Sequence, residues 1–276
     1  MKTPLFSKRV SYIFYTRNHA PLLDEALKRM RELKKSEDEV IVVDGGSTDN
    51  TAAVVAKYQD LVEVFISEPD FSLGHALNRG ILVSNGKYLH PMADDDTTYP
   101  EPMEQAVKIM DEHPEIDLLV CGGEKFKNNR LRMFYVPPGV NYGSDLKDSF
   151  NYGACGAGFL IRRDALARIG RLYAVGLLGD LEFVTQLISS GKATVKFCRL
   201  KLFYHPILEH SHIKKFAKES AADSDRVMRK YCSKTFYWKV KLKALYNRIH
   251  WRLYVRIFGQ RPPDKKMEYT WDGGFS

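Results

Sequence analysis

Apolar runs and amphipathic stretches alternate along the first part of the chain. Four runs are apolar, β-branched or aromatic enough to be buried strands, at residues 10–16, 39–44, 62–67 and 87–93. The stretches between them have the spacing of amphipathic helices, at 21–35, about 51–58 and 73–84. Strands that alternate with helices predict a parallel sheet with right-handed crossovers, whose ligands bind beyond the carboxyl ends of the strands.

The same pattern continues to about residue 212. The elements expected after the fourth strand are a helix at 100–113, a strand at 116–123, helices at 162–170 and 179–191, and a strand at 193–205. A Gly-, Asn- and Tyr-rich stretch at 128–158 has weak periodicity, which is typical of a lid, a binding loop or a disordered segment. We predict an α/β fold with a mostly parallel sheet flanked by helices.

Charge divides the chain into two parts at that boundary. Residues 1–212 hold 26 Lys+Arg and 28 Asp+Glu, whereas residues 213–276 hold 16 and 6, and the whole chain has a net charge of +8. The basicity therefore belongs to the tail alone, and we expect no nucleic-acid-binding face on the main body. We predict a catalytic domain over 1–212 and a basic, aromatic, helical tail over 213–276.

Cysteine spacing and hydropathy exclude several classes of protein. The four cysteines, Cys121, Cys155, Cys198 and Cys232, show no CxxC pair, so neither a disulfide framework nor a zinc site is indicated. The N-terminal residues lack the long apolar core of a signal peptide, and no window of about 18 uncharged apolar residues occurs. We expect a protein of a reducing compartment that is neither secreted nor membrane-spanning.

Three adjacent carboxylates, Asp94, Asp95 and Asp96, directly follow the predicted strand 87–93. Each carboxylate opposes the ionisation of its neighbours, so the cluster costs free energy unless a cation offsets it. A divalent cation held by oxygen ligands is one candidate partner. The alternative is a solvated acidic turn or a helix N-cap, since aspartate is common before a helix.

Three segments resemble the family 2 glycosyltransferases in their order and spacing: VVDGGSTDNT, ISEPDFSLGHALNRGILVSNGKYLHPMADDDTTYP and GDLEFVTQL. The resemblance covers roughly residues 8–212. It implies an inverting enzyme of the GT-A fold that uses a nucleotide-diphosphate sugar as donor. A divalent ion would then bridge the diphosphate to protein carboxylates and stabilise both donor binding and the departure of the leaving group.

The resemblance implies particular metal ligands. Alignment on Pro100 puts the two adjacent aspartates of the family on Asp95 and Asp96, with Asp95 the first choice as ligand of Mn²⁺ or Mg²⁺. Ala93 replaces the usual leading Asp or Asn. Asp94 occupies the variable position and is a candidate for binding the nucleotide-sugar donor. In some GT-A enzymes a C-terminal histidine completes the metal ligands, and here His210 or His212 is the candidate, although each histidine could equally be a structural one.

Donor-binding residues are also implied at the other strand ends. Asp44 matches the carboxylate that accepts a hydrogen bond from the base, and in an unrelated α/β protein the same residues would form an Asx-turn and capping box. Thr16, Arg17 and Asn18 match the nucleotide-contacting loop, with a plain polar loop as the alternative. Two further candidates follow on the helix 73–84, Asn78 and Arg79, which could reach the diphosphate or sugar. A surface helix charge is the alternative for the arginine, and His75 stands where relatives often have Asp.

The general base of an inverting transfer must deprotonate the attacking hydroxyl. The family's base lies in a Glu-Asp or Gly-Asp pair that opens a helix, which maps onto Gly179 and Asp180. Glu182, two positions later, should point elsewhere on the helix. The alternative role for Asp180 is a simple N-cap.

The tail has apolar residues at helical spacing beside arginines at intervals of four. The apolar positions are Leu242, Leu245, Ile249, Leu253 and Ile257, the arginines are Arg248, Arg252 and Arg256, and the aromatic residues are Trp238, Tyr246, Trp251 and Tyr254. A basic amphipathic helix with such rings is typical of attachment to an anionic membrane surface. The alternative is a helix packed on the catalytic domain.

Together these features predict a metal-dependent inverting glycosyltransferase at the cytoplasmic, inner face of the cell membrane. Its donor would be a nucleotide-diphosphate sugar, with UDP-sugars favoured, and the transferred group a hexosyl or N-acetylhexosaminyl residue. Its acceptor would be a hydroxyl of a lipid-linked or growing bacterial surface glycan. The alternatives are a catalytically silent binding module of the same fold and a nucleotidyltransferase, although TRNHAPLL lacks the Gly-rich loop ending in Arg and Lys of that class.

Overall fold

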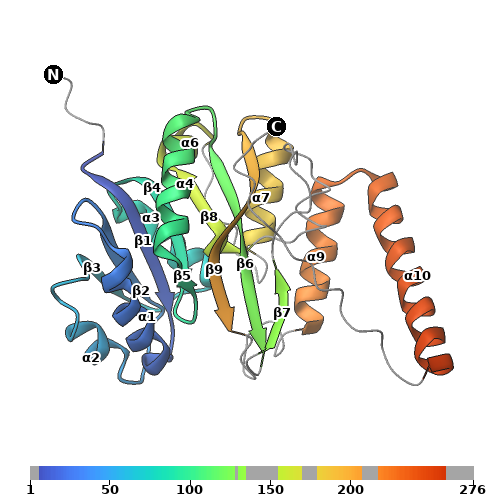
Figure 1. The fold of residues 1–276 in the computed structure, drawn as a ribbon, viewed down its shortest axis with the longest axis horizontal. Helices are drawn as coiled ribbons and strands as arrows, with labels where there is room; N and C mark the ends of the chain where they lie inside the picture. The colour runs from blue at the N-terminus through green and yellow to red at the C-terminus, as the bar shows by residue number, and fades with distance from the viewer. Residues whose placement is uncertain (1–5, 128–129, 135–154, 170–178, 207–216, 259–276) are drawn as a thin grey trace.

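The protein forms one twisted sheet with helices on both faces and two further helices at its C-terminal side (Figure 1). The coordinates are a computed structural model, and they describe residues 6–127, 130–134, 155–169, 179–206 and 217–258. The predicted α/β fold with a mostly parallel sheet is confirmed.

The strands of the described residues lie in the order β3-β2-β1-β4-β8-β6-β9-β5, and β7 pairs with β6. Their bounds are β1 Lys8–Thr16, β2 Glu39–Asp44, β3 Val64–Ser67, β4 Gly86–Ala93, β5 Thr97–Thr98, β6 Leu118–Lys127, β7 Arg130–Phe134, β8 Phe159–Arg162 and β9 Val195–Pro206. β1 to β4 run parallel to one another, as do β6 and β9, whereas β8 is antiparallel to both neighbours. The ends of β1, β2 and β4 therefore reach the same edge of the sheet.

The helices flank this sheet. Their bounds are α1 Ala20–Leu33, α2 Thr51–Ala56, α3 Leu73–Val83, α4 Pro100–Glu112, α6 Arg163–Ile169, α7 Gly179–Ser190, α9 Ala217–Tyr231 and α10 Lys234–Phe258, with a 3-10 turn at Gly156–Gly158. One apolar core lies between the sheet and α1, α2 and α4, and a second lies between the sheet and α3, α6 and α7.

Side chains of strand β1 contribute to both apolar cores. Val10, Tyr12 and Phe14 belong to the first core and Ile13 to the second, because successive side chains of a strand point to opposite faces. Gly80 lets α3 approach the second face closely, since a Cβ there would lie 2.3 Å from the Ile13 side chain. Both faces of the strand are therefore covered, as expected for a parallel sheet.

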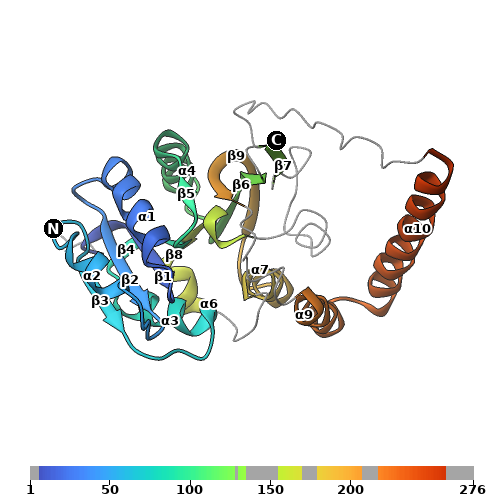
Figure 2. The same cartoon turned by 90° about the horizontal axis from the view of Figure 1, so that it is seen from below.

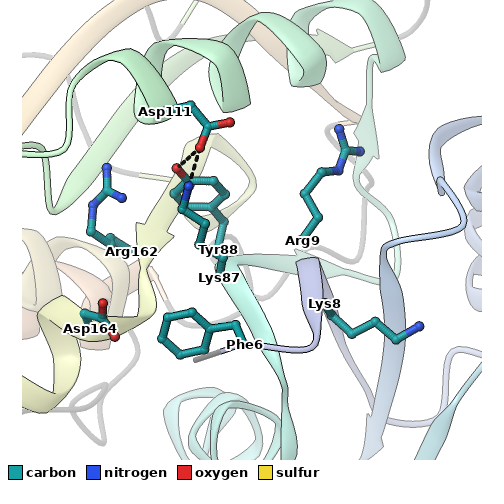
Figure 3. A pocket seen from close by; sticks show the side chains of 8 residues that line it. All are labelled: Phe6, Lys8, Arg9, Lys87, Tyr88, Asp111, Arg162 and Asp164. Atoms are coloured by element: carbon teal, nitrogen blue, oxygen red, sulfur yellow. Dashed lines mark hydrogen bonds and ion pairs between the residues drawn. The ribbon is translucent and has the colours of Figure 1, made fainter. Parts of the chain in front are cut away.

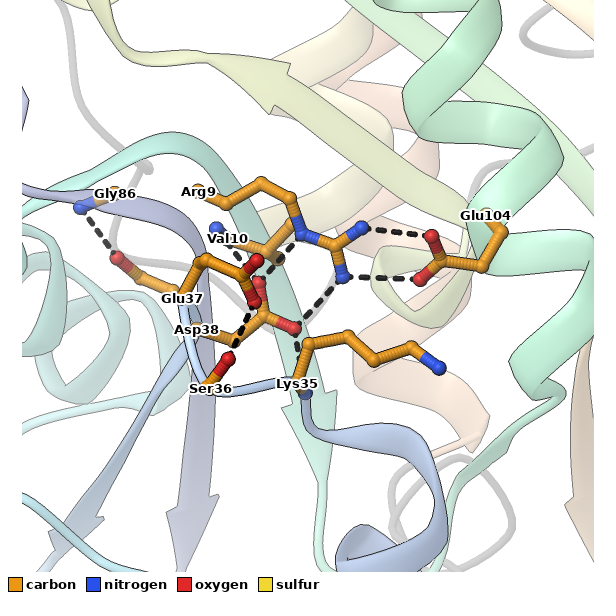
Figure 4. Close-up of polar contacts among 9 residues, drawn as sticks. Arg9, Val10, Lys35, Ser36, Glu37, Asp38, Gly86 and Glu104 are labelled. Carbon is orange, nitrogen blue, oxygen red and sulfur yellow. Dashed lines mark hydrogen bonds and ion pairs between the residues drawn. The ribbon is translucent and has the colours of Figure 1, made fainter.

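The edge opposite the predicted site is fixed by an ionic network (Figure 4). The guanidinium of Arg9 donates two hydrogen bonds of 2.8 Å to the buried carboxylate of Asp38, and two more, of 2.8 and 2.9 Å, to Glu104 on α4. Asp38 also accepts hydrogen bonds from the backbone N–H groups of Val10 and Lys35. This network ties the amino ends of β1 and β2 to Glu104 of α4.

The last two helices lie to one side of the sheet, with α9 beside α7 and α10 farther out (Figures 1 and 2). The carboxylate of Glu182 on α7, only 3% exposed, pairs with Arg226 and Lys230 of α9. It also accepts a hydrogen bond of 3.3 Å from Tyr231. Among the described helices, none is long and apolar enough to cross a membrane.

Several elements differ from the sequence-based expectation. The helix expected at 51–58 ends at Ala56, and the strand expected from residue 62 begins at Val64. The antiparallel strands β5, β7 and β8 and the separate helix α9 were not predicted. Each strand is five residues or shorter, which is too short to carry a clear alternation of apolar and polar positions.

Candidate active site

The carboxyl ends of β1, β2 and β4 bring the predicted donor-binding residues to one edge of the sheet. Thr16 ends β1, Asp44 ends β2, and the two are register partners across the parallel pair. The register of β1 with β4 pairs Tyr15 with Ala93, which places the aspartate cluster next to the end of β1. The fold thus gathers residues that lie up to 80 positions apart in the sequence.

Asp95, Asp96 and His205 form a group whose ligand atoms all lie within 4.8 Å of one another. His205 comes from β9, which reaches the site because β5 pairs with it antiparallel, Thr97 opposite Tyr204. The Nδ1 of His205 lies 2.7 Å from Oδ1 of Asp96, whose Oδ2 accepts a hydrogen bond of 3.1 Å from the N–H of Ala93. Two carboxylates and an imidazole are a donor set that suits Mn²⁺ and, with more water ligands, Mg²⁺.

The electrostatics of this group favour a cation. Burial and the neighbouring charge of Asp96 raise the pKa of Asp95 to about 7, and His205 acts in the opposite direction. A buried carboxyl with a raised pKa is one whose negative charge is not fully compensated by the protein. A bound divalent ion would supply that compensation, so the residues present fit the metal that the resemblance implies.

Asp94 faces a different set of partners. Its Oδ2 accepts a hydrogen bond of 2.7 Å from the hydroxyl of Thr16 and lies 3.0 Å from Nδ1 of His19. The hydrogen bond to Asp94, together with the Asp94 charge, raises the pKa of His19. Asp94 is therefore not part of the Asp95–Asp96–His205 group, and it holds the loop after β1 against the loop after β4.

Asp44 is 1% exposed and organises the loop that follows β2. It accepts hydrogen bonds from the N–H of Ser47 at 3.0 Å and from the hydroxyl of Ser67 on β3 at 2.7 Å. Asn18, at φ 56°, joins the neighbouring loop to this one, because its N–H donates to Ser47 Oγ and its Oδ1 accepts from the N–H of Thr48, both at 2.7 Å. The loops after β1 and β2 therefore form one unit.

Each of the two predicted arginines lies near a carboxylate. Arg79 lies 3.1 Å from the carboxylate of Glu68 and donates to the carbonyl of the same residue at 3.2 Å. Arg17 is 60% exposed and lies 3.9 Å from Asp70. Asn78, in the same helix as Arg79, has a polar contact of its own. The predicted donor contacts of all three residues stay predictions.

Asp180 lies at the start of α7, where the resemblance places the base. Its Oδ2 accepts a hydrogen bond of 2.7 Å from the N–H of Gly156. Burial raises the pKa of Asp180 to about 6, with Asp96 adding to the rise and the Gly156 hydrogen bond opposing it. The pKa of Tyr15 at the end of β1 is raised as well, by burial and then by the charges of Asp180, Asp96 and Asp95. Asp180 and the aspartate cluster thus share one electrostatic environment.

A model of the family described as glycosyl transferase family 2 matches residues 11–170. The chain belongs to this family. The chain is 30% identical over 149 residues to an uncharacterized glycosyltransferase of Rickettsia typhi, a match that covers 54% of this chain and 46% of that protein. It is 28% identical to the amylovoran biosynthesis glycosyltransferase AmsE of Erwinia amylovora, over 41% of this chain and 43% of that protein. The chain thus spans less than half the length of these curated relatives.

Solved structures share the fold of this chain. TarS of S. aureus, residues 1–349 in complex with UDP-GlcNAc, superposes with a TM-score of 0.64 at 22% identity, over 81% of this chain and 65% of that chain. The mannosyltransferase PcManGT of Pyrobaculum calidifontis, in complex with GDP-Man and Mn²⁺, superposes with a TM-score of 0.60 at 18% identity, over 82% and 65%. The predicted GT-A fold is confirmed.

The histidine near the aspartates is His205, not one of the two named from the sequence. His210 and His212 lie outside the described residues, so the prediction that one of them binds metal stays a prediction. A signal for His205 was present, because it is the last residue of the expected strand 193–205, at the level where the other strands end in carboxylates. The sequence pattern alone does not distinguish it from a structural histidine, because the β5–β9 pairing brings it to the aspartates.

A pocket of about 390 Å³ lies away from these residues, at the amino ends of β1 and β4 (Figure 3). It is lined by Phe6, Lys8, Arg9, Lys87, Tyr88, Asp111, Arg162 and Asp164. Asp111 accepts hydrogen bonds from Lys87 and from the hydroxyl of Tyr88, and Arg162 donates to the carbonyls of Met110, His113 and Ile116. None of the site residues predicted from the sequence lines this pocket.

Proposed function

We propose that the protein is a metal-dependent inverting glycosyltransferase. It moves a hexosyl or N-acetylhexosaminyl group from a nucleotide-diphosphate sugar, with a UDP-sugar favoured, to a hydroxyl group. The observation that carries this proposal is the Asp95–Asp96–His205 group at the same sheet edge as Asp44 and Asp180. Two structural neighbours support the donor class, because TarS has been solved in complex with UDP-GlcNAc and PcManGT in complex with GDP-Man and Mn²⁺.

Different residues would bind different parts of the nucleotide-sugar donor. Asp95, Asp96 and His205 would hold Mn²⁺ or Mg²⁺, which when bound neutralises charge on the diphosphate. Asp44 would accept a hydrogen bond from the base, and Asp94 contacts Thr16 and His19 on either side of Arg17 and Asn18. Arg79 would have to exchange Glu68 for the diphosphate to contribute a donor contact.

Asp180 would deprotonate the acceptor hydroxyl as the oxygen attacks the anomeric carbon. The new bond forms between that oxygen and the anomeric carbon, and the bond from the same carbon to the diphosphate oxygen breaks, so the nucleoside diphosphate leaves on the opposite face. A pKa of about 6 suits this role, since the carboxylate is ionised at neutral pH and is still basic enough to accept a proton.

For the acceptor we propose a lipid-linked or growing bacterial surface glycan, at the inner face of the cell membrane. AmsE is described as acting in amylovoran biosynthesis, which is consistent with a glycan acceptor. The uneven charge of the chain is consistent with a membrane location, since the tail carries all of the excess of Lys and Arg over Asp and Glu.

Asp180→Asn tests the assignment of the base. Turnover should fall by about 10² to 10⁴, the usual effect of losing a general base, while donor binding stays nearly intact. Turnover is followed as release of nucleoside diphosphate, and donor affinity by calorimetry of the same preparation. Asp164→Asn on α6 is a control that should change neither. Wild-type turnover in Asp180→Asn would show that another residue is the base.

Donor hydrolysis without acceptor separates an enzyme from a silent binding module. An enzyme should release free sugar slowly from its donor, and chelation of the metal should stop the release. A module that binds the donor and never releases sugar, with or without acceptor, would contradict the proposed function.

A further inference from the structure

Helix α10 carries a stripe of exposed apolar side chains. Trp238, Leu242, Leu245 and Ile249 are 61, 62, 50 and 52% exposed, and successive members are four, three and four residues apart. That spacing puts them on one face of the helix. Tyr246, next to the stripe, is 66% exposed. A contiguous apolar surface of this kind marks a site of interaction.

The apolar stripe is not the face of α10 that packs against α9. Tyr237 is buried against α9, where its hydroxyl donates to Asp225 at 2.9 Å and accepts from Arg229 at 2.6 Å. Lys241, one turn later on the same side, pairs with Asp225 as well. Both views show α9 between α10 and the rest of the fold (Figures 1 and 2). The apolar stripe therefore lies on a different side of α10 from the contact with α9.

The positive charge of α10 indicates what kind of surface it binds. The sequence of α10 contains seven lysines and arginines and no Asp or Glu, namely Lys234, Lys239, Lys241, Lys243, Arg248, Arg252 and Arg256. Two copies of such a helix would repel each other, whereas an anionic surface attracts the positive charges that the protein does not pair itself. Tryptophan and tyrosine favour the boundary between headgroups and acyl chains. We infer that α10 docks on an anionic lipid bilayer with this apolar stripe buried in the interface.

The docking surface is held in a fixed place relative to Asp180. Glu182 lies one half-turn after Asp180 on α7, and its buried carboxylate pairs with Arg226 and Lys230 of α9. α9 leads into α10 through Cys232 and Ser233. A bilayer bound to α10 would therefore lie at a set distance from the proposed base. This last consequence depends on the proposed function, but the docking itself does not.

Vesicle co-sedimentation of the full chain tests the inference. The probes are vesicles of phosphatidylcholine alone and of phosphatidylcholine with phosphatidylglycerol. The triple substitution Leu242→Ser, Leu245→Ser, Ile249→Ser removes most of the stripe, and Leu82→Ser, at a residue on α3 that is 70% exposed, is the matched control. Donor binding by each variant reports whether the catalytic body is intact.

We expect the wild type to bind the anionic vesicles at least about tenfold better than the neutral ones, and to release them as salt rises to about 0.5 M. The triple variant should lose at least about tenfold in partition while Leu82→Ser keeps it. Failure of the wild type to bind anionic vesicles, or equal binding by the triple variant, would overturn the inference. So would a wild-type dimer in sedimentation equilibrium that the triple variant abolishes, because the stripe would then join two copies.

Discussion

At the scale of single residues, the site depends on carboxylates whose ionisation the fold controls. Asp44 ends β2, Asp95 follows β4 and Asp180 lies in the first turn of α7, and their surroundings differ. Asp44 accepts hydrogen bonds from Ser47 in the loop that follows it and from Ser67 on β3, whereas burial raises the pKa of Asp180 to about 6 and of Asp95 to about 7. Residues of one type therefore have separate tasks, set by their environment.

Asp180 gives a prediction about pH. A general base works only when deprotonated, so turnover should fall about tenfold per pH unit below about 6 and be level above it. The measurement is the pH profile of kcat at saturating donor and metal, where bound metal keeps Asp95 ionised. Asp180→Asn should lack this limb. A flat wild-type profile between about pH 5 and 8, or a rate that falls as pH rises through 6, would contradict the role.

His205 gives a prediction about metal affinity. His205→Gln should weaken Mn²⁺ binding by about 10- to 100-fold, since it removes an imidazole next to both aspartates. Manganese titration in the presence of nucleoside diphosphate measures the change. His113→Gln is the control, because that side chain lies beside Glu115 at the end of α4. If His210→Gln or His212→Gln lost Mn²⁺ while His205→Gln kept it, the original sequence prediction would be the better one.

At the scale of elements, the long central strands and helices could be predicted from the sequence and the short ones could not. The run EVIVVD matches β2 residue for residue, because a strand covered on both faces needs an unbroken apolar sequence. β5 has two residues and β8 has four, and their positions depend on pairing with β9, β4 and β6 rather than on local pattern. His205 was missed for the same reason, since only the β5–β9 pair brings it to the aspartates.

The function of Glu182 likewise needed tertiary information. The sequence showed only that it points away from Asp180, whereas its partners lie more than 40 residues later, on α9. Hydrogen bonds and ion pairs with Arg226 and Lys230 lower the pKa of Glu182 to about 2. The contact fixes α9 to the helix that begins with the proposed base.

Glu182→Gln should lower the free energy of unfolding by about 1–3 kcal/mol at pH 7, because a buried carboxylate with charged partners is lost. Since the pKa of Glu182 in the folded protein lies below its ordinary value of 4.5, its contribution is complete above about pH 4.5 and is lost as pH falls towards 2. Urea unfolding at several pH values measures the difference. Glu101→Gln on the exposed first turn of α4 is the control. A difference that did not shrink on acidification would contradict the ionic account.

At the scale of the whole molecule, the proposed active-site carboxylates and the excess positive charge lie in different parts of the chain. The neutral-to-acidic residues 1–212 contain the carboxylates of the proposed active site, and the excess of Lys and Arg lies after residue 212. α9 connects the two parts by ion pairs to α7, so the predicted boundary falls before a helix that contacts the body closely. The division at 212 stays a prediction, and α10 is the segment of the tail with the larger exposed apolar surface.

The central claim is that Asp95, Asp96 and His205 bind a nucleotide diphosphate through a divalent metal. Isothermal titration of the full chain with UDP, GDP and dTDP, each with Mn²⁺ and with chelator, tests it most directly. We predict that at least one nucleotide, with UDP favoured, binds in Mn²⁺, that chelator abolishes the binding, and that Asp95→Ala weakens it by at least about tenfold. Absence of binding by all three nucleotides in Mn²⁺, or equal binding by wild type and Asp95→Ala, would contradict the account.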